Sequence, residues 1–270
     1  MFVKQCPQAL THELTGVNHN VIEEMATALD RCRECDVARL EPGIQFGASD
    51  GDPDQWYDVE ADDVDLRSSI IPEEEVSKSE PDQTLKWEQW TGLVQRGRPD
   101  SLVLKRLNPN VTVAGAPGAG CIRKPEWKRI ATRMLQNRKV ILHTDGARSY
   151  KLRVSGMLHD HVVHKKKPLT DKKGHIVKKN GKTVWVKPFY TRTFKHRLPS
   201  GKFLHVRGGT QVIDRVWQSL RKYCKHKHGK AGSAQVVRYV RAAQWCYWNH
   251  GKSMWSSTGS MLNALTNVDS

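Results

Sequence analysis

The sequence has no apolar run of the roughly 18 residues that a transmembrane helix requires. Its mean hydropathy is −0.63, and 38% of its 270 residues are hydrophobic. Residues 1–6 also lack the apolar core of a secretory signal peptide. These absences argue against a membrane protein and predict an intracellular one, and the length allows one large core or two modest ones.

Cysteines with metal-ligand spacing are scarce. The six cysteines are scattered, and only Cys32 and Cys35 are separated by two residues. A zinc ribbon needs a second pair of this kind, so no zinc is predicted, and the thiols are expected to be reduced and partly buried.

Acidic residues are rare after residue 85. Residues 1–85 hold 6 Lys and Arg against 20 Asp and Glu, a net charge of −14, whereas the remainder holds 38 against 8, a net charge of +30. Such a one-sided charge predicts a polyanionic partner, with nucleic acid as the first candidate, rather than a small-molecule substrate. A membrane surface is disfavoured because no basic helix has a broad apolar face.

Residues 1–40 are predicted to be helical, with a short helix over 9–14 and a longer one after a turn at 15–18. The expected core face of the longer helix consists of Val21, Ile22, Met25, Leu29 and Cys32. A helix-turn-helix remnant is one interpretation, but the exposed acids disfavour a reader of the major groove: Glu23, Glu24 and Asp30. A helical docking element is favoured, followed by a linker over 41–55.

An acid-rich strand is predicted over residues 56–62. It contains Asp58, Glu60 and Asp62, and it is followed by Asp63 and Asp65. So many carboxylates repel one another and resist burial unless a bound cation relieves the repulsion. The alternative is an exposed acidic edge strand, continuous with the polar segment that runs to residue 83.

Two strands, a loop and a helix separate this strand from the next candidate site residue. Strands over 90–96 and 101–107 flank a turn at 97–100, and residues 114–120 form a Gly-rich loop. A helix that begins at Pro125 is expected to bury one stripe, formed by Trp127, Ile130, Ala131, Met134 and Leu135.

The most informative stretch is residues 140–152. Residues 140–143 predict a buried strand that leads into Thr144, Asp145 and Gly146, with a short helix over 147–152. An acid at the carboxyl end of such a strand is where open α/β sheets place catalytic or metal-binding carboxylates. The alternative is that Asp145 only caps the helix.

Residues 159–164 predict another strand, with His159 and His161 on one face and His164 on the other. Structural or substrate-side histidines are favoured over a metal-ligand set. An insertion over about 165–207 follows, with a hairpin at Asn180 and Gly181. Its basic residues are expected to contact phosphate backbone: Lys172, Lys173, Lys178, Lys179 and Lys182.

A helix is predicted after Thr210, its expected N-cap. Its core stripe consists of Ile213, Trp217, Leu220 and Cys224. The neighbouring stripe consists of Asp214, Gln218, Arg221 and Lys225. A last helix is expected over about 233–248, and residues 251–270 are expected to form a polar tail.

The order of these elements predicts an α/β fold of the RNase H-like type, a mixed sheet flanked by helices. Its three acids fall on the first strand, at the end of the fourth strand and on the last core helix. Carboxylates in this arrangement hold two Mg²⁺ (or Mn²⁺) ions roughly 4 Å apart for phosphoryl transfer on nucleic acid.

Several segments resemble DDE-type transposases of the ISXO insertion-sequence type and their eukaryotic Merlin relatives. They are residues 59–63, 143–146 with Tyr150, 159–164, and 209–217 with 220–222. The resemblance spans about residues 56–250 and implies a catalytic domain there, with Asp62, Asp145 and Asp214 as catalytic acids and metal ligands. It also implies a homo-oligomer, nuclear in a eukaryote, with DNA contacted by Arg221, Lys222 and Lys225.

The sequence departs from that family at three points. The third acid is commonly Glu there and is Asp214 here, and the family's N-terminal zinc ribbon has no counterpart. The residues after the first acid also differ, so Asp63 or Asp65 is an alternative first acid, with His164 as an auxiliary residue. The leading hypothesis is a transposase that cleaves DNA and transfers strands. It stands ahead of a domesticated, inactive DNA-binding derivative and a metal-dependent repair or junction nuclease.

Overall fold

The computed structural model describes residues 8–71, 84–164, 166–171, 173–225 and 227–267. The chain forms two compact units, one of residues 1–45, 63–120 and 215–270, the other of residues 46–62 and 121–214. The first unit groups the N-terminal helices with the C-terminal ones. The domain boundaries expected from the sequence differ, with separate segments over residues 1–40, 41–55, 56–250 and 251–270. No helix in the described ranges is both long and apolar enough to span a bilayer.

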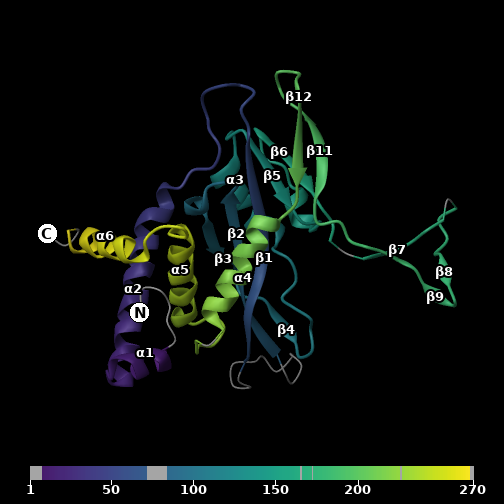
Figure 1. The fold of residues 1–270 in the computed structure, drawn as a ribbon. Helices are drawn as coiled ribbons and strands as arrows, with labels where there is room; N and C mark the ends of the chain where they lie inside the picture. The colour runs from purple at the N-terminus through teal and green to yellow at the C-terminus, as the bar shows by residue number, and fades with distance from the viewer. Residues whose placement is uncertain (1–7, 72–83, 165, 172, 226, 268–270) are drawn as a thin grey trace. The chain divides into compact units, whose positions relative to one another are not determined.

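The strands of the largest sheet are β1 (Tyr57–Ile70), β2 (Thr84–Gln95), β3 (Val103–Arg106), β4 (Val111–Val113), β5 (Val140–Thr144) and β6 (Met157–His161). Their order is β3-β2-β1-β5-β6, with β4 also paired to β2 (Figure 1). Strand β2 is antiparallel to β3, whereas β5 is parallel to both β1 and β6. The predicted mixed α/β class is confirmed. The alternative of an acidic edge strand is wrong, because β1 has hydrogen-bonded neighbours on both sides.

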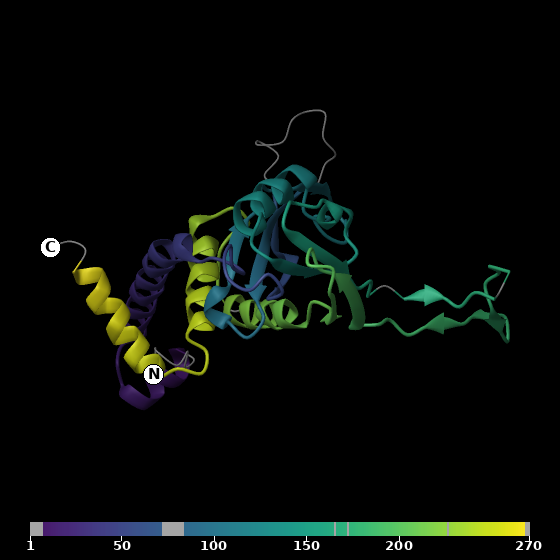
Figure 2. The same ribbon diagram turned by 90° about the horizontal axis from the view of Figure 1, so that it is seen from above.

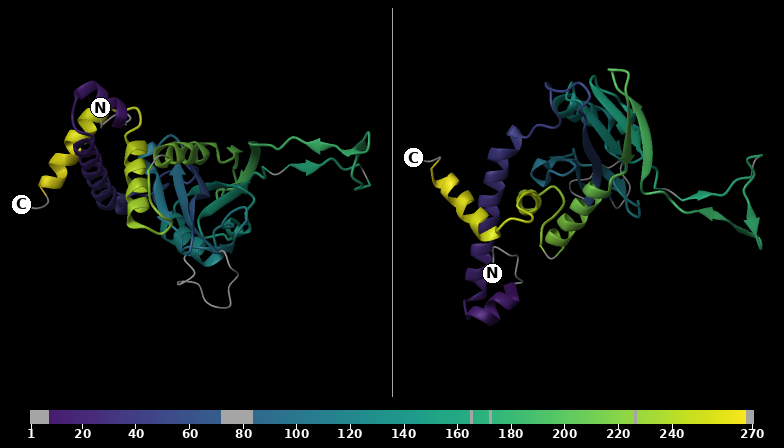
Figure 3. Two further views of the ribbon diagram at one scale, coloured as in Figure 1. Left: turned by 90° about the horizontal axis from the view of Figure 1, so that it is seen from below. Right: turned by 45° about the horizontal axis from the view of Figure 1, so that its top comes forward.

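In the first unit, the short helix predicted over 9–14 is α1 (Gln8–Thr15), and the longer one is α2 (His19–Leu40). Helix α2 packs against α5 (Ala234–Trp248) and α6 (Met254–Thr266), as Figure 3 shows. The predicted core face was wrong in part: Ile22 is fully buried, whereas Val21 and Met25 are 44% and 51% exposed. The other buried residues of α2 are Asp30, Arg33, Asp36 and Val37.

Polar partners explain why the buried face of α2 differs from its apolar pattern. Asp30 accepts a hydrogen bond from the Tyr223 hydroxyl at 2.5 Å, and Asp36 accepts one from the Trp245 indole at 2.9 Å. Buried charges are tolerated where they are paired in this way. Hydrophobic periodicity alone cannot reveal such a face.

Two segments expected to be irregular have fixed positions. The predicted polar tail contains helix α6, which begins after Ser253, whose hydroxyl accepts a hydrogen bond from the Ser256 amide. In the predicted linker, Glu41 is buried and accepts hydrogen bonds from the Leu104 amide at 3.0 Å and the Arg241 guanidinium at 2.8 Å. Burial raises the pKa of Glu41, but Arg241 and Lys105 lower it further, so the net pKa is below the ordinary value.

The second unit holds the most accurately predicted elements. Helix α3 (Lys124–Leu135) buries Trp127, Ile130, Ala131 and Leu135, as its periodicity indicates, whereas Met134 of the predicted stripe is only partly buried. All residues of β5 are buried, and the short helix expected after it is the 3-10 helix η5 (Arg148–Lys151). Trp127 meets Tyr150 of η5 edge to face, with 4.7 Å between the ring centroids, which fixes this segment against α3.

The insertion consists of short two-stranded ladders (Figure 2). Strand β7 (Lys167–Pro168) pairs with β10 (Trp185–Val186), and β8 (Lys178–Lys179) pairs with β9 (Lys182–Thr183). Asn180 and Gly181 have φ angles of 51° and 73°, as the predicted tight hairpin requires. A longer ladder that was not predicted follows, formed by β11 (Arg192–Arg197) and β12 (Phe203–Gly208), and it leads into helix α4 (Gln211–Cys224).

Candidate active site

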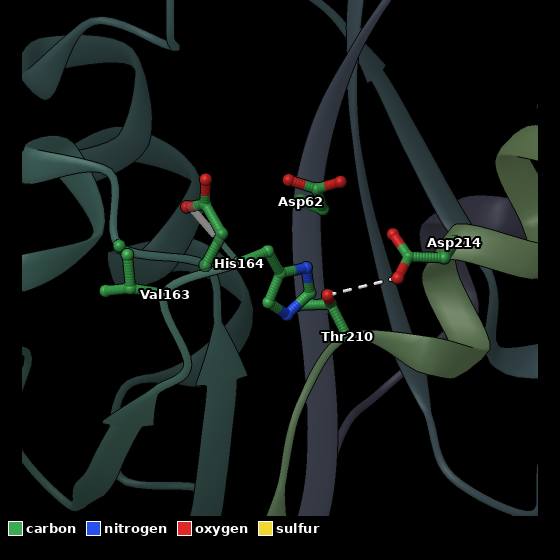
Figure 4. A pocket seen from close by; sticks show the side chains of 7 residues that line it. Asp62, Val163, His164, Thr210 and Asp214 are labelled. Atoms are coloured by element: carbon green, nitrogen blue, oxygen red, sulfur yellow. Dashed lines mark hydrogen bonds between the residues drawn. The ribbon is translucent and has the colours of Figure 1, made fainter. Parts of the chain in front are cut away.

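The three predicted acids line one pocket of about 310 Å³. Its walls are formed by Asp62, Asp145, Gly146, Val163, His164, Thr210 and Asp214 (Figure 4). All of these residues belong to the second unit, residues 46–62 and 121–214. Side chains from β1, from the segments after β5 and β6, and from the first turn of α4 therefore meet at one place.

Strand register brings the first two acids together. Strands β1 and β5 are parallel, and Glu60 is the partner of His143. Two residues after Glu60 stands Asp62, within β1, and two residues after His143 stands Asp145, directly after the last residue of β5. The two acids therefore come close enough to line the same pocket. The residue after the carboxyl end of β5, Asp145, thus lines a pocket, where the sequence predicts a site residue.

Asp145 makes a local contact as well as lining the pocket. Its Oδ1 accepts a hydrogen bond from the Ala147 amide at 2.8 Å. The capping interpretation and the site interpretation are therefore compatible, because one contact holds the carboxylate in place. Gly146 allows the backbone after Asp145 to lie close to Val163, because a Cβ at this position would be only 2.8 Å from a methyl carbon of Val163.

Asp214 is half-buried at the start of α4. Burial raises its pKa above the ordinary value, and the nearby charge of Asp145 adds to that rise, whereas the Thr210 hydroxyl and His164 oppose it. The Thr210 hydroxyl donates to Asp214 Oδ2 at 3.3 Å, the dashed line in Figure 4. A positive group placed in the pocket would relieve the electrostatic strain between the two carboxylates.

Glu60 holds the start of α4 in place, which was not predicted. This carboxylate is 1% exposed, and its Oε2 accepts hydrogen bonds from the Val212 and Ile213 amides at 2.7 and 3.0 Å. Thr210 was the expected N-cap, but its hydroxyl donates to Asp214, and the first turn is capped by a side chain from β1. The helix dipole favours a negative charge there. Glu60 thus positions the turn that carries Asp214.

A row of polar side chains connects four strands of the second unit. His143 is fully buried, with its Nε2 2.9 Å from Asp58 and its Nδ1 2.8 Å from Asp160. Asp160 also contacts His196 Nε2 of β11 at 3.0 Å. A neutral imidazole has one N–H, so two carboxylate partners require an imidazolium or a protonated carboxyl. His143 and Asp160 are shielded from solvent, whereas the Asp58 side chain is 37% exposed, and together with His196 they tie β1, β5, β6 and β11 together.

The two alternative first acids lie outside the pocket. Asp63 contacts the Gln89 side chain of β2 at 3.3 Å, and Asp65 accepts a hydrogen bond from the Ala119 amide at 2.9 Å. Both belong to the first unit. Asp62 is therefore the acid of β1 that shares a pocket with Asp145 and Asp214.

His159 and His164, on and just after β6, have different surroundings. His159 Nε2 lies 2.9 Å from the Thr144 hydroxyl, which donates its own proton to the Asp145 carbonyl, so the histidine must be the donor. His164 follows the end of β6 and lines the pocket. Its Nε2 is buried and has no hydrogen-bond partner within the described ranges, and its ring lies 5.2 Å from that of Tyr190.

Acid conditions are expected to destabilise the chain through His159. Burial lowers the pKa of His159 from 6.5 to about 4, and His161 adds to this shift. Stability from the neutral ring is therefore present above pH 6.5 and is lost as the pH falls toward 4. The unfolding free energy should drop by about 2 kcal/mol from this group between pH 7 and pH 5. Denaturant titrations of His159→Gln should lack that drop, whereas the exposed His250→Gln variant should retain it.

The predicted DNA-binding residues are exposed where they are described. Arg221, Lys222 and Lys225 lie on or just after α4, and Arg221 follows Asp214 by two helical turns. Exposed lysines of the insertion are Lys173, Lys178, Lys179 and Lys182. Lys172 lies outside the described residues.

Two further observations concern metals and thiols. Within the described ranges, no group of three His, Cys, Asp or Glu side chains is arranged to hold a metal ion. The described cysteines Cys32, Cys35, Cys121, Cys224 and Cys246 form no disulfide with one another. Cys32, Cys224 and Cys246 are partly buried, as expected, whereas Cys35 and Cys121 are exposed, and burial raises the pKa of Cys224 to about 11. Cys6 lies outside the described residues.

The comparisons with known proteins give no relative for this chain. No protein-family model matches it, and neither the curated proteins nor the solved structures contain a significant match.

Proposed function

We propose that this chain is a transposase-like enzyme that cleaves and transfers DNA strands by metal-dependent phosphoryl transfer. The observation that carries the proposal is the convergence of Asp62, Asp145 and Asp214 on one pocket. The described residues that line the pocket include no Ser, Cys or Lys. Carboxylates clustered in this way suit the activation of water or a DNA hydroxyl rather than covalent catalysis by the protein.

The topology supports an RNase H-like assignment. The sheet order β3-β2-β1-β5-β6 combines an antiparallel pair at one end with parallel strands at the other. The first acid lies on β1, the second follows β5, and the third lies on the helix after β12. The sequence resemblance to ISXO-type and Merlin transposases names the same three positions.

The chemistry of the pocket fits Mg²⁺ or Mn²⁺. These ions prefer oxygen ligands, and Mg²⁺ keeps several waters while binding one or two carboxylates, so three protein ligands around one ion are not required. Asp62, Asp145 and Asp214 would hold the ions. When bound, two such ions would supply Lewis-acid stabilisation of the attacking and leaving oxygens.

Residues in and around the pocket hold the carboxylates in place. The Ala147 amide fixes the orientation of Asp145, and the Thr210 hydroxyl fixes that of Asp214. Glu60 holds the first turn of α4, and burial strengthens the mutual repulsion of the acids. His164 presents an imidazole to the same pocket, and an imidazole there would be able to exchange a proton with a substrate oxygen.

DNA is the proposed substrate because the chain is strongly basic after residue 85 and its lysines are exposed. Arg221, Lys222 and Lys225 would contact the backbone near α4, and Lys173, Lys178, Lys179 and Lys182 would do so from the insertion. Strand transfer joins two DNA ends, so a homo-oligomer is part of the proposal.

Metal removal tests the function directly. Purified protein incubated with supercoiled plasmid should produce nicked circles with Mn²⁺ or Mg²⁺. Excess EDTA should reduce the rate to background, because the acids would no longer have cations to offset their repulsion. Plasmid binding that falls steeply with salt, without nicking under either metal, would leave the domesticated DNA-binding alternative and remove the enzyme proposal.

A further inference from the structure

The pairing of β11 with β12 determines which side chains share each face of this ribbon. Residues directly opposite each other in an antiparallel ladder point to the same side. One face therefore carries the pairs Phe194–Val206 and His196–Leu204, and Arg192 with Gly208. The other carries the pairs Thr193–Arg207, Lys195–His205 and Arg197–Phe203. We call the second set the outer face of the ribbon.

The first face is attached to the rest of the second unit. His196 contacts Asp160 of β6 at 3.0 Å, and Val206 is buried. Gly208 leaves no room for a side chain, since a Cβ there would lie 2.3 Å from Asp160 Oδ1. The ribbon is therefore held close to β6 by one side, and its outer face is directed away from that contact.

The outer face is basic and exposed. Lys195, Arg197, Phe203, His205 and Arg207 are all solvent-exposed. Within the described ranges, no carboxylate lies within salt-bridge distance of Lys195, Arg197 or His205, whereas Lys202 in the turn pairs with Asp54. Arg207 donates to the Thr191 hydroxyl at 3.2 Å.

Intrachain contacts do not account for this concentration of positive charge. Lys195, Arg197 and Arg207 share this face, and the residues paired on it include no Asp or Glu, so their positive charges repel one another. Lys195 Nζ lies 4.1 Å from the centroid of the Phe203 ring. Phe203 is nevertheless 56% exposed. An anionic partner would offset the repulsion, so the face indicates a binding surface.

The ribbon is continuous with the pocket. Strand β12 leads through Gly209 and Thr210 into α4, whose first turn carries Asp214. On the other strand, His196 is linked through Asp160 to His143, two residues before Asp145. Both connections lie within residues 121–214, which form part of one compact unit. A polymer that contacts the outer face would thus be held at a fixed place relative to the acids.

We propose that the outer face of the β11–β12 ribbon binds the phosphate backbone of double-stranded DNA and positions it for the pocket. This inference rests on the proposed function. Lys and Arg suit backbone contacts that are independent of base sequence. The major groove of B-form DNA admits a two-stranded ribbon, whereas the major groove of A-form RNA is deep and narrow, so duplex DNA is favoured over duplex RNA.

The test measures binding without catalysis. Fluorescence anisotropy with a labelled mixed-sequence duplex, in EDTA and over a salt series, compares the wild type with the double variant Lys195→Gln/Arg197→Gln. The variant should bind about tenfold more weakly at physiological salt, and the salt slope should fall by about 0.9 for each phosphate that is no longer neutralised. The matched control is Lys128→Gln/Arg129→Gln on the exposed side of α3, which removes the same charge from the same unit. It should bind like the wild type.

Two kinds of control separate a loss of DNA contacts from a loss of folding. Circular dichroism and thermal unfolding should match the wild type in all variants, and Lys195→Arg/Arg197→Lys should restore binding because it restores the charge. An unchanged affinity and salt slope in the Gln variant would overturn the ribbon inference, as would tighter binding of the wild type to duplex RNA than to DNA. If binding depends on the ribbon but plasmid is never nicked with Mg²⁺ or Mn²⁺, the proposed function fails and the ribbon inference stands.

Discussion

Substituting Asp145 by Asn is expected to reduce metal-dependent nicking by on the order of a thousandfold while the chain stays folded. The side-chain oxygen of Asn can still accept the hydrogen bond that the Ala147 amide gives to Asp145 at 2.8 Å. Only the negative charge is removed, and that charge is what a metal ion in the pocket would require. Initial nicking rates with Mn²⁺, at matched protein concentration and matched circular dichroism, measure the effect.

The control for this prediction is Asp65→Asn. Asp65 is a β1 acid that accepts a hydrogen bond from the Ala119 amide and does not line the pocket. The same removal of one charge should therefore leave the nicking rate within a few-fold of the wild type. Equal rates in wild type and Asp145→Asn would remove Asp145 from the catalytic assignment. A decrease in Asp65→Asn as large as in Asp145→Asn would mean that the pocket does not define the site.

Substituting Glu60 by Ala is expected to lower the free energy of unfolding by roughly 3 kcal/mol. The change removes the acceptor of two amide hydrogen bonds at the start of α4, and it leaves those amides without a partner beside the buried Ile213. The first turn should then shift, moving Asp214, so nicking should fall even in protein that remains folded. Urea unfolding and nicking rates measure the two effects separately.

Two comparison variants define what this result means. Glu60→Gln keeps one acceptor oxygen, so its decrease in stability should be clearly smaller than that of the Ala variant. Glu24→Ala, at an exposed position of α2, should change the unfolding free energy by no more than about 0.5 kcal/mol. If Glu60→Ala were as stable and as active as the wild type, Glu60 would not position α4.

Local patterns were sufficient for much of the second unit. The apolar spacing of α3, the run of buried residues in β5 and the Asn180-Gly181 turn each depend on neighbours in sequence, and each prediction is confirmed. The stripe on α4 was likewise correct, with Ile213, Trp217 and Leu220 buried. The order of the elements predicts three acids, and the resemblance to ISXO-type transposases implies Asp62, Asp145 and Asp214, which line one pocket.

The predictions that failed depended on contacts between distant residues. The predicted core face of α2 was partly wrong because Asp30, Arg33 and Asp36 are buried against polar partners. Hydrophobic periodicity does not indicate a buried face of this kind. The helix in the supposed tail was missed for a simpler reason, since residues 254–266 carry few strong signals of their own. The β11–β12 ribbon depends on a pairing across a turn, which its mixed basic and aromatic residues do not specify.

The sequence by itself determined the mixed α/β class, the principal helices and strands, and the candidates for the acidic site. Only the tertiary structure decided which acid of β1 belongs with Asp145 and Asp214, because Asp62, Asp63 and Asp65 differ only in the side of the strand and the depth along it. The parallel register of β1 with β5 resolves that choice. Glu60 can remain buried at the start of α4 because a buried carboxylate is stable where hydrogen-bond donors satisfy it, and here the donors are two amides of α4.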